Sequence, residues 1–189
     1  MNTRKLPILT ILVLVLLSML ACTIFIGGPD YPGTRIPVST EAAGEIQSTM
    51  QTAIAEGASS GQVSLVITES QLTSYLAYKL QAQTDPFITD PQVSLRDGQI
   101  QIYGTAEQGY FKATARIRLS AGIDDQGQIK IELVSADFGP LPIPAGLLNT
   151  ITATMQETFT GAIGPAAIGF RLESITITDG SMTIVGKTK

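Results

Sequence analysis

Residues 111–121 read Phe111-Lys112-Ala113-Thr114-Ala115-Arg116-Ile117-Arg118-Leu119-Ser120-Ala121. Apolar side chains alternate with polar or charged ones along this stretch, which is typical of a β-strand with one face on a core and the other in solvent. The same period of two extends over residues 93–133, and Asp97-Gly98 interrupts it with two residues that tolerate the positive φ of a tight hairpin turn. The pattern predicts an antiparallel sheet with one apolar face.

Helical patterns precede and follow this predicted sheet. One helix is expected over residues 39–58, and a second begins at the capping-box spacing of Thr68 and Gln71 and continues to about residue 83. A third apolar stripe predicts a helix over residues 145–160. The expected fold class is α+β: a curved antiparallel β-sheet packed against two or three amphipathic helices, with an N-terminal signal or anchor helix.

A second Asp-Gly hairpin is expected near the end of the chain. Residues 175–186 repeat the apolar, polar and turn pattern of residues 93–104 at an offset of 82 positions, and a predicted amphipathic helix precedes each hairpin. The similarity indicates either an internal repeat of helix plus hairpin, or two hairpins that look alike because the same turn physics shapes both.

The N-terminal segment carries a targeting pattern. Arg4 and Lys5 precede an uncharged, mostly apolar stretch over residues 6–21, which is the order of a signal peptide. The stretch ends in Leu16-Leu17-Ser18-Met19-Leu20-Ala21-Cys22, which resembles the lipobox of bacterial lipoproteins, whose cysteine is lipid-modified before the signal is cleaved. The alternative is an uncleaved anchor, because residues 6–26 carry no charge over about the length that crosses a bilayer.

These patterns divide the chain into three segments. Residues 1–21 are expected to be a lipoprotein signal peptide or an uncleaved anchor, and residues 22–38, rich in glycine and proline, a stalk linker. Residues 39–189 are expected to form a single α+β domain. Cys22 is the expected attachment site for a palmitate-type lipid. The expected location is the cell envelope, membrane-anchored and facing outside the cytoplasm, because the basic N-terminus stays inside; inner and outer membrane both stay open.

Composition narrows the chemistry. The chain has no histidine and a single cysteine, which excludes Ser-His-Asp and Cys-His catalysis and histidine metal sites. The only adjacent pair of carboxylates, Asp124 and Asp125, lies in a predicted turn between two strands, so we expect no catalytic or calcium-binding role for it. The net charge of −4 makes nucleic acid an unsuitable partner. We therefore expect no enzyme, no metal and no cofactor, with the membrane and a phospholipid as the expected partners and protein partners left open.

The order in which the predicted helices and hairpins follow one another resembles that of a known protein family. It rests on Thr68-Glu69-Ser70-Gln71-Leu72, the hairpin over residues 95–104, Gly139-Pro140-Leu141-Pro142 before the third helix, and the Asp179-Gly180 hairpin. In this order the chain resembles the LmeA-type and YpmS-type bacterial envelope proteins. The resemblance implies helices laid in a curved antiparallel sheet, related to half of a tubular lipid-binding domain, and the binding of phospholipid or another lipid in an apolar groove.

A curved sheet with one apolar face either closes its core completely or leaves a groove, and an apolar groove suits an acyl chain. The predicted function is a membrane-anchored extracytoplasmic protein that binds a lipid or other apolar ligand in a groove between sheet and helices. The alternative is a non-enzymatic envelope interaction or assembly factor with a closed core, which a cavity too small for an acyl chain would favour. The candidate lining residues, each of which is alternatively a core residue, are Leu72, Leu76, Phe111, Ile117, Leu119, Ile131, Leu133, Leu147, Ile151 and Met155.

Overall fold

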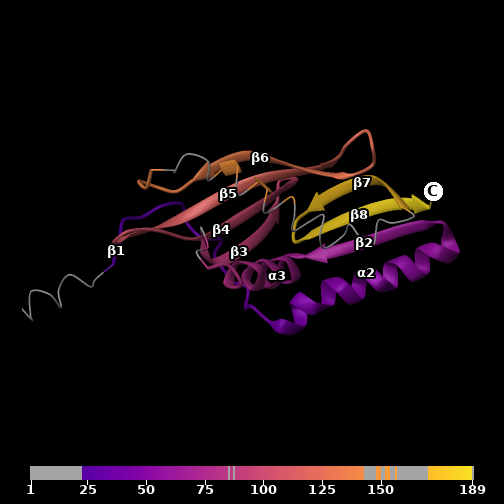
Figure 1. Cartoon of the computed structure of the whole chain (residues 1–189), viewed down its shortest axis with the longest axis horizontal. Helices are drawn as coiled ribbons and strands as arrows, with labels where there is room; N and C mark the ends of the chain where they lie inside the picture. The colour runs from indigo at the N-terminus through magenta and orange to yellow at the C-terminus, as the bar shows by residue number, and fades with distance from the viewer. Residues whose placement is uncertain are drawn as a thin grey trace, which may run out of the picture.

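Helices and strands alternate early in the chain and strands dominate later, which gives an α+β fold (Figure 1). The computed structural model describes residues 23–84, 86, 88–142, 148–149, 152–153, 156 and 170–188. The elements in chain order are β1 (Ile24–Phe25), α2 (Thr40–Ser60), β2 (Gln62–Thr68), α3 (Glu69–Gln81), β3 (Thr89–Arg96), β4 (Gln99–Gln108), β5 (Phe111–Ile123), β6 (Ile129–Asp137), β7 (Phe170–Thr178) and β8 (Ser181–Thr188).

Both helices begin where their capping residues predict. The Ser39 hydroxyl accepts a hydrogen bond of 3.1 Å from the backbone N–H of Ala42 and caps the start of α2. Gly61, with a left-handed φ of 76°, caps its C-terminal end. At α3, the Thr68 hydroxyl accepts from the N–H of Gln71, and the Gln71 side chain accepts from the N–H of Thr68. The predicted capping box is confirmed, and it satisfies two backbone N–H groups at the start of α3.

The larger sheet is built around β5. β4 pairs along one side of β5 and β6 along part of the other, while β3 pairs with the far side of β4. The predicted alternation is confirmed, since Ala113, Ala115, Ile117 and Leu119 are all completely buried. The predicted hairpin between β3 and β4 is also confirmed. Its Asp97-Gly98 turn has φ values of 56° and 69°, which places Val93 opposite Ile102.

β1 is the one parallel strand described in this sheet. β6 pairs with β5 only from Arg116 onward, so the edge of β5 ahead of Arg116 is open to another partner. Residues 24–27 occupy that edge: the N–H of Ile24 donates to the Tyr110 carbonyl at 2.7 Å, and the N–H of Thr114 donates to the Gly27 carbonyl at 2.9 Å. These residues belong to the segment expected as a stalk linker, and their backbone is hydrogen-bonded to the sheet.

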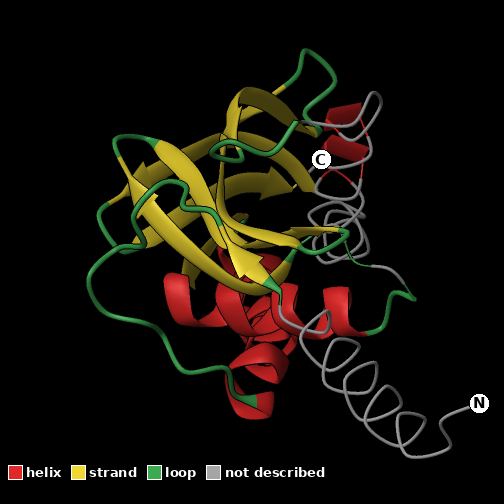
Figure 2. Cartoon of the chain, turned by 90° about the vertical axis from the view of Figure 1, so that its left-hand side faces the viewer, coloured by secondary structure: helices red, strands yellow, loops and turns green. Residues whose placement is uncertain are grey.

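The last two strands lie in a second sheet, in the order β2, β8, β7, and Figure 2 shows how the strands curl over the helices. The expected curled, antiparallel-rich sheet is present, and its strands are divided into two sheets. β8 pairs antiparallel with β2 along its whole length, so the second hairpin extends β2 and not the larger sheet. Within that hairpin Ile175 lies opposite Ile184, the same pairing as Val93 with Ile102 at an offset of 82 positions.

Glu69, the first residue of α3, joins the two sheets. Its carboxylate accepts hydrogen bonds from the N–H of Leu95 at 2.7 Å and from the Arg96 guanidinium at 2.5 Å, at the end of β3. Its own N–H donates to the carbonyl of Gly180, and the N–H of Gly180 donates to the carbonyl of Leu95. The start of α3 therefore holds both hairpin turns together.

The third expected helix lies largely outside the described residues. Leu148, Asn149, Thr152, Ala153 and Gln156 have helical backbone. The Gln156 side chain accepts from the N–H of Ile131 at 2.9 Å and donates to the carbonyl of Ile129 at 2.7 Å. The amide thus satisfies two backbone groups of β6. In the part of the chain that the structure describes, no helix has both the length and the hydropathy that a membrane span needs.

Candidate lipid-binding site

The candidate site is the apolar face of the larger sheet together with α3. Five of the predicted lining residues meet there in one core cluster. Ile117 and Leu119 on β5 are 0% exposed, and the remaining three are Leu72 and Leu76 on α3 and Ile131 on β6, at 3 to 6%. Leu133 is partly buried and packs against the same cluster. Alternating apolar positions on strands and i, i+4 positions on the helix bring these side chains together.

The other predicted residues lie elsewhere. Phe111 is 46% exposed at the beginning of β5, away from the buried cluster. Leu147, Ile151 and Met155, together with Cys22, lie outside the described residues. The five residues that do meet are covered nearly completely, so each of them is a core residue in the part of the chain that the structure describes.

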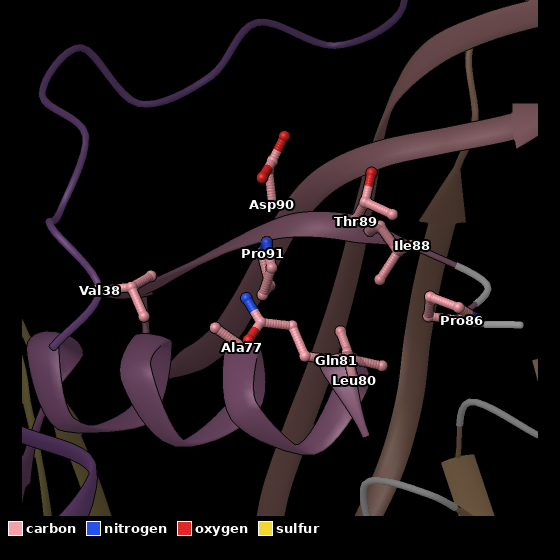
Figure 3. Close-up of a pocket in the computed structure, with 9 residues that line it drawn as sticks. All are labelled: Val38, Ala77, Leu80, Gln81, Pro86, Ile88, Thr89, Asp90 and Pro91. Carbon is pink, nitrogen blue, oxygen red and sulfur yellow. The ribbon is translucent and has the colours of Figure 1, made fainter. Parts of the chain in front are cut away.

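A cavity of about 140 Å³ lies at one end of this core, between the last turn of α3 and the start of β3 (Figure 3). Figure 3 shows Ala77, Leu80 and Gln81 on the helix facing Ile88 and Pro91 on the strand side. The complete lining is Val38, Ala77, Leu80, Gln81, Pro86, Ile88, Thr89, Asp90 and Pro91. It contains none of the residues predicted from the sequence, but Ala77 and Leu80 belong to the same helix as Leu72 and Leu76.

A β-bulge shapes the strand side of the cavity. The register of β3 against β4 shifts between Thr89 and Gln92, and Asp90 has a φ of 50°. A bulge leaves extra backbone unpaired and bends its strand, which here moves residues 88–91 along the end of α3. In the sequence, Asp90-Pro91 could have indicated this bulge. Proline has no N–H to donate to a neighbouring strand, and within sheets it is often found at bulges.

Ile88 forms the floor of this end of the core. Its side chain is 1% exposed and lies directly over Gly104 of β4, where a Cβ atom would collide with it. Gly104 therefore lets an isoleucine from outside the regular strand pack against the sheet. The apolar spacing in the sequence indicates neither the burial of Ile88 nor the need for glycine at position 104, because the pairing of β3 with β4 alone brings the two residues together.

The chemistry of the site is apolar. The side chains around the cavity are mostly hydrocarbon, with the Gln81 amide, the Thr89 hydroxyl and the Asp90 carboxylate as the polar groups. Across the described residues, no three His, Cys, Asp or Glu side chains come together in a way that could hold a metal ion. The arrangement is suited to holding hydrocarbon out of water.

The fold and the site define a class: a curled, antiparallel-rich sheet whose apolar face packs on amphipathic helices. The family model LmeA, described as LmeA-like phospholipid-binding, matches residues 28–187, and the chain belongs to this family. The LmeA part of the resemblance seen in the sequence is confirmed. Neither curated proteins nor solved structures give a match to the chain. The family is described by binding, and its description names no catalysed reaction.

Proposed function

We propose that this protein binds phospholipid, with an acyl chain lodged between α3 and the apolar face of the larger sheet. The observation that carries the proposal is the match of residues 28–187 to the LmeA-like phospholipid-binding family. The apolar cavity beside α3 supports it, because the cavity continues the same side-chain layer as Leu72 and Leu76.

Binding requires the cavity to widen. Sites that enclose a small ligand usually measure about 300–1,000 Å³, whereas the cavity beside α3 measures about 140 Å³. Widening at the bulge beside Asp90 needs little loss of hydrogen bonding, since the ladder between β3 and β4 is already interrupted there. An acyl chain would enter at this end and extend toward Ile117 and Leu119.

We further propose that the protein acts at the cell envelope, anchored to a membrane and facing outside the cytoplasm. The support is the order of Arg4 and Lys5, the apolar residues 6–21 and Cys22. Anchoring would place a phospholipid-binding domain directly at the source of its ligand. Attachment through a lipid on Cys22 and attachment through an uncleaved helix both fulfil this role.

Photo-crosslinking tests the binding proposal. The full chain is reconstituted in vesicles that contain a phosphatidylcholine with a photoactivatable group at the end of one acyl chain, and crosslinked residues are mapped by mass spectrometry. We expect crosslinks at buried positions such as Leu80, Ile88 and Ile117, because only a chain inserted into the domain reaches them. Crosslinks confined to residues 1–28 and to exposed side chains would show that no acyl chain enters.

The second candidate function is an envelope interaction or assembly factor with a closed core. The tight burial of Leu72, Leu76, Ile117, Leu119 and Ile131 favours it, since these side chains already fill the space between sheet and helix. The same crosslinking experiment separates the two candidates, because an interaction factor with a closed core would leave those five positions unlabelled while the chain still associates with the vesicles.

A further inference from the structure

Large apolar side chains gather at one end of the molecule, and no element that the structure describes covers them. They lie on β1 and at the turn that leads into β5. The exposed fractions are 64% for Phe25, 63% for Tyr110, 55% for Ile24 and 46% for Phe111. The first three are the most exposed large hydrophobic side chains in the part of the chain that the structure describes. Figure 1 places this end of the molecule opposite β2, β7 and β8. We call these four residues the apolar tip.

The strand pairing places apolar groups on both sides of the tip. Ile24 lies opposite Phe111 in the parallel pairing of β1 with β5, so these two side chains share one face. Phe25 follows Ile24 in the strand and therefore faces the other side. Tyr110 lies in the turn next to Gly109, which has a φ of 60°. A tip that is apolar on both faces is suited to insertion into a layer, whereas a protein partner would cover one face.

The position of the tip in the chain identifies that layer. Ile24 follows Cys22 by two residues, a span of at most about 7 Å of extended backbone. Cys22 in turn closes the uncharged residues 6–21. Hydrogen bonds from Ile24 to Tyr110 and from Ile26 to Lys112 hold this part of the chain on the sheet. An anchor that enters a bilayer at Cys22 therefore brings the tip to the level of the lipid headgroups.

Charge at the tip is already neutralised. Lys112 is the nearest basic residue on β5, and its ammonium lies 2.7 Å from a carboxylate oxygen of Glu107. Insertion consequently leaves this ion pair at the rim, in the polar headgroup layer, while the four apolar side chains enter the boundary with the acyl chains. Tyrosine is well suited to that boundary, because its ring is apolar and its hydroxyl can stay hydrated.

We propose that the apolar tip inserts into the surface of the bilayer that holds residues 1–22, and so orients the domain on the membrane. This inference rests on the membrane anchorage of the proposed function. Phe111 begins the face of β5 that continues with the buried Ala113 and Ala115. A phospholipid that leaves the bilayer at the tip would meet this apolar side of the sheet first.

The absence of tryptophan from the chain allows a direct test. Tryptophan is introduced singly by Phe25→Trp and by Phe111→Trp in the full chain, reconstituted in phosphatidylcholine vesicles with or without acyl-chain-brominated lipid. The matched control is Val66→Trp on β2, since Val66 is 47% exposed and Phe111 46%. We expect blue-shifted emission and quenching by bromolipid at positions 25 and 111, and neither at position 66.

Two further results decide the outcome. Adding Phe25→Glu to the Phe111→Trp variant should cause a loss of quenching at position 111, because a carboxylate at the tip resists insertion. Vesicle flotation is measured on every variant. A chain that floats with vesicles while tryptophan at positions 25 and 111 is quenched no more than at 66 would overturn the tip proposal alone. A chain that does not float would overturn the anchorage on which it rests.

Discussion

Gly104 is the residue that most directly controls the packing near the cavity. Because Ile88 occupies the space where a side chain would lie, Gly104→Ala overpacks this end of the core, and we expect a loss of about 1–3 kcal/mol in the free energy of unfolding. The measurement is a urea titration followed by circular dichroism. The matched control is Gly44→Ala in α2.

Gly44 is exposed in the helix interior, with nothing within 4 Å of an added Cβ. The control should therefore gain about 0.5–1 kcal/mol from better helix propensity. Opposite signs for the same chemical change are the expected result. Destabilisation of similar size in both variants would contradict the assigned contact between Gly104 and Ile88.

At the scale of the element, α3 decides whether the cavity can take hydrocarbon. Ala77 lies on the cavity side of the helix and is 2% exposed. Ala77→Leu would fill the space with protein, so we expect acyl-chain crosslinking at Leu80 and Ile88 to fall sharply. The unfolding free energy should change by less than about 1.5 kcal/mol if the cavity absorbs the added volume.

The matched control for this prediction is Ala55→Leu, because Ala55 is on the exposed side of α2. It adds the same atoms away from the cavity and should leave crosslinking unchanged. Equal crosslinking in both variants, with folding intact, would mean that the ligand occupies some other part of the molecule.

At the scale of the whole molecule, the proposed attachment to a membrane can be tested at Cys22. A cleaved lipoprotein would have a mass that lacks residues 1–21 and includes acyl groups. We expect Cys22→Ser to remove the acyl mass and to leave residues 1–21 in place, because the cysteine is required for both steps. Intact-protein mass spectrometry of membrane extracts checks this. A wild-type chain that keeps residues 1–21 without acylation would support the uncleaved anchor.

Much of the local structure was predictable from the sequence. The Asp97-Gly98 and Asp179-Gly180 turns, the capping box at Thr68 and the alternation along β5 all depend on residues a few positions apart, and the structure confirms each of them. The same local physics placed Leu72, Leu76, Ile117, Leu119 and Ile131 on the apolar faces of their own helix or strands, as residues that line a groove or belong to a core. Backbone geometry alone is sufficient for these features, because turn dihedrals and side-chain period need no distant partner.

The tertiary structure decided the rest. Alternation assigned Phe111 to the apolar face, but whether a side chain on that face is covered depends on what lies above it, and nothing described covers Phe111. β1 could not be predicted, because it lies in a segment rich in glycine and proline. It forms because β6 leaves one edge of β5 open. The split into two sheets, the contact of Ile88 with Gly104 and the cavity at the bulge likewise join residues far apart in the chain. Such contacts follow from how completed elements fill space, and no local pattern encodes that.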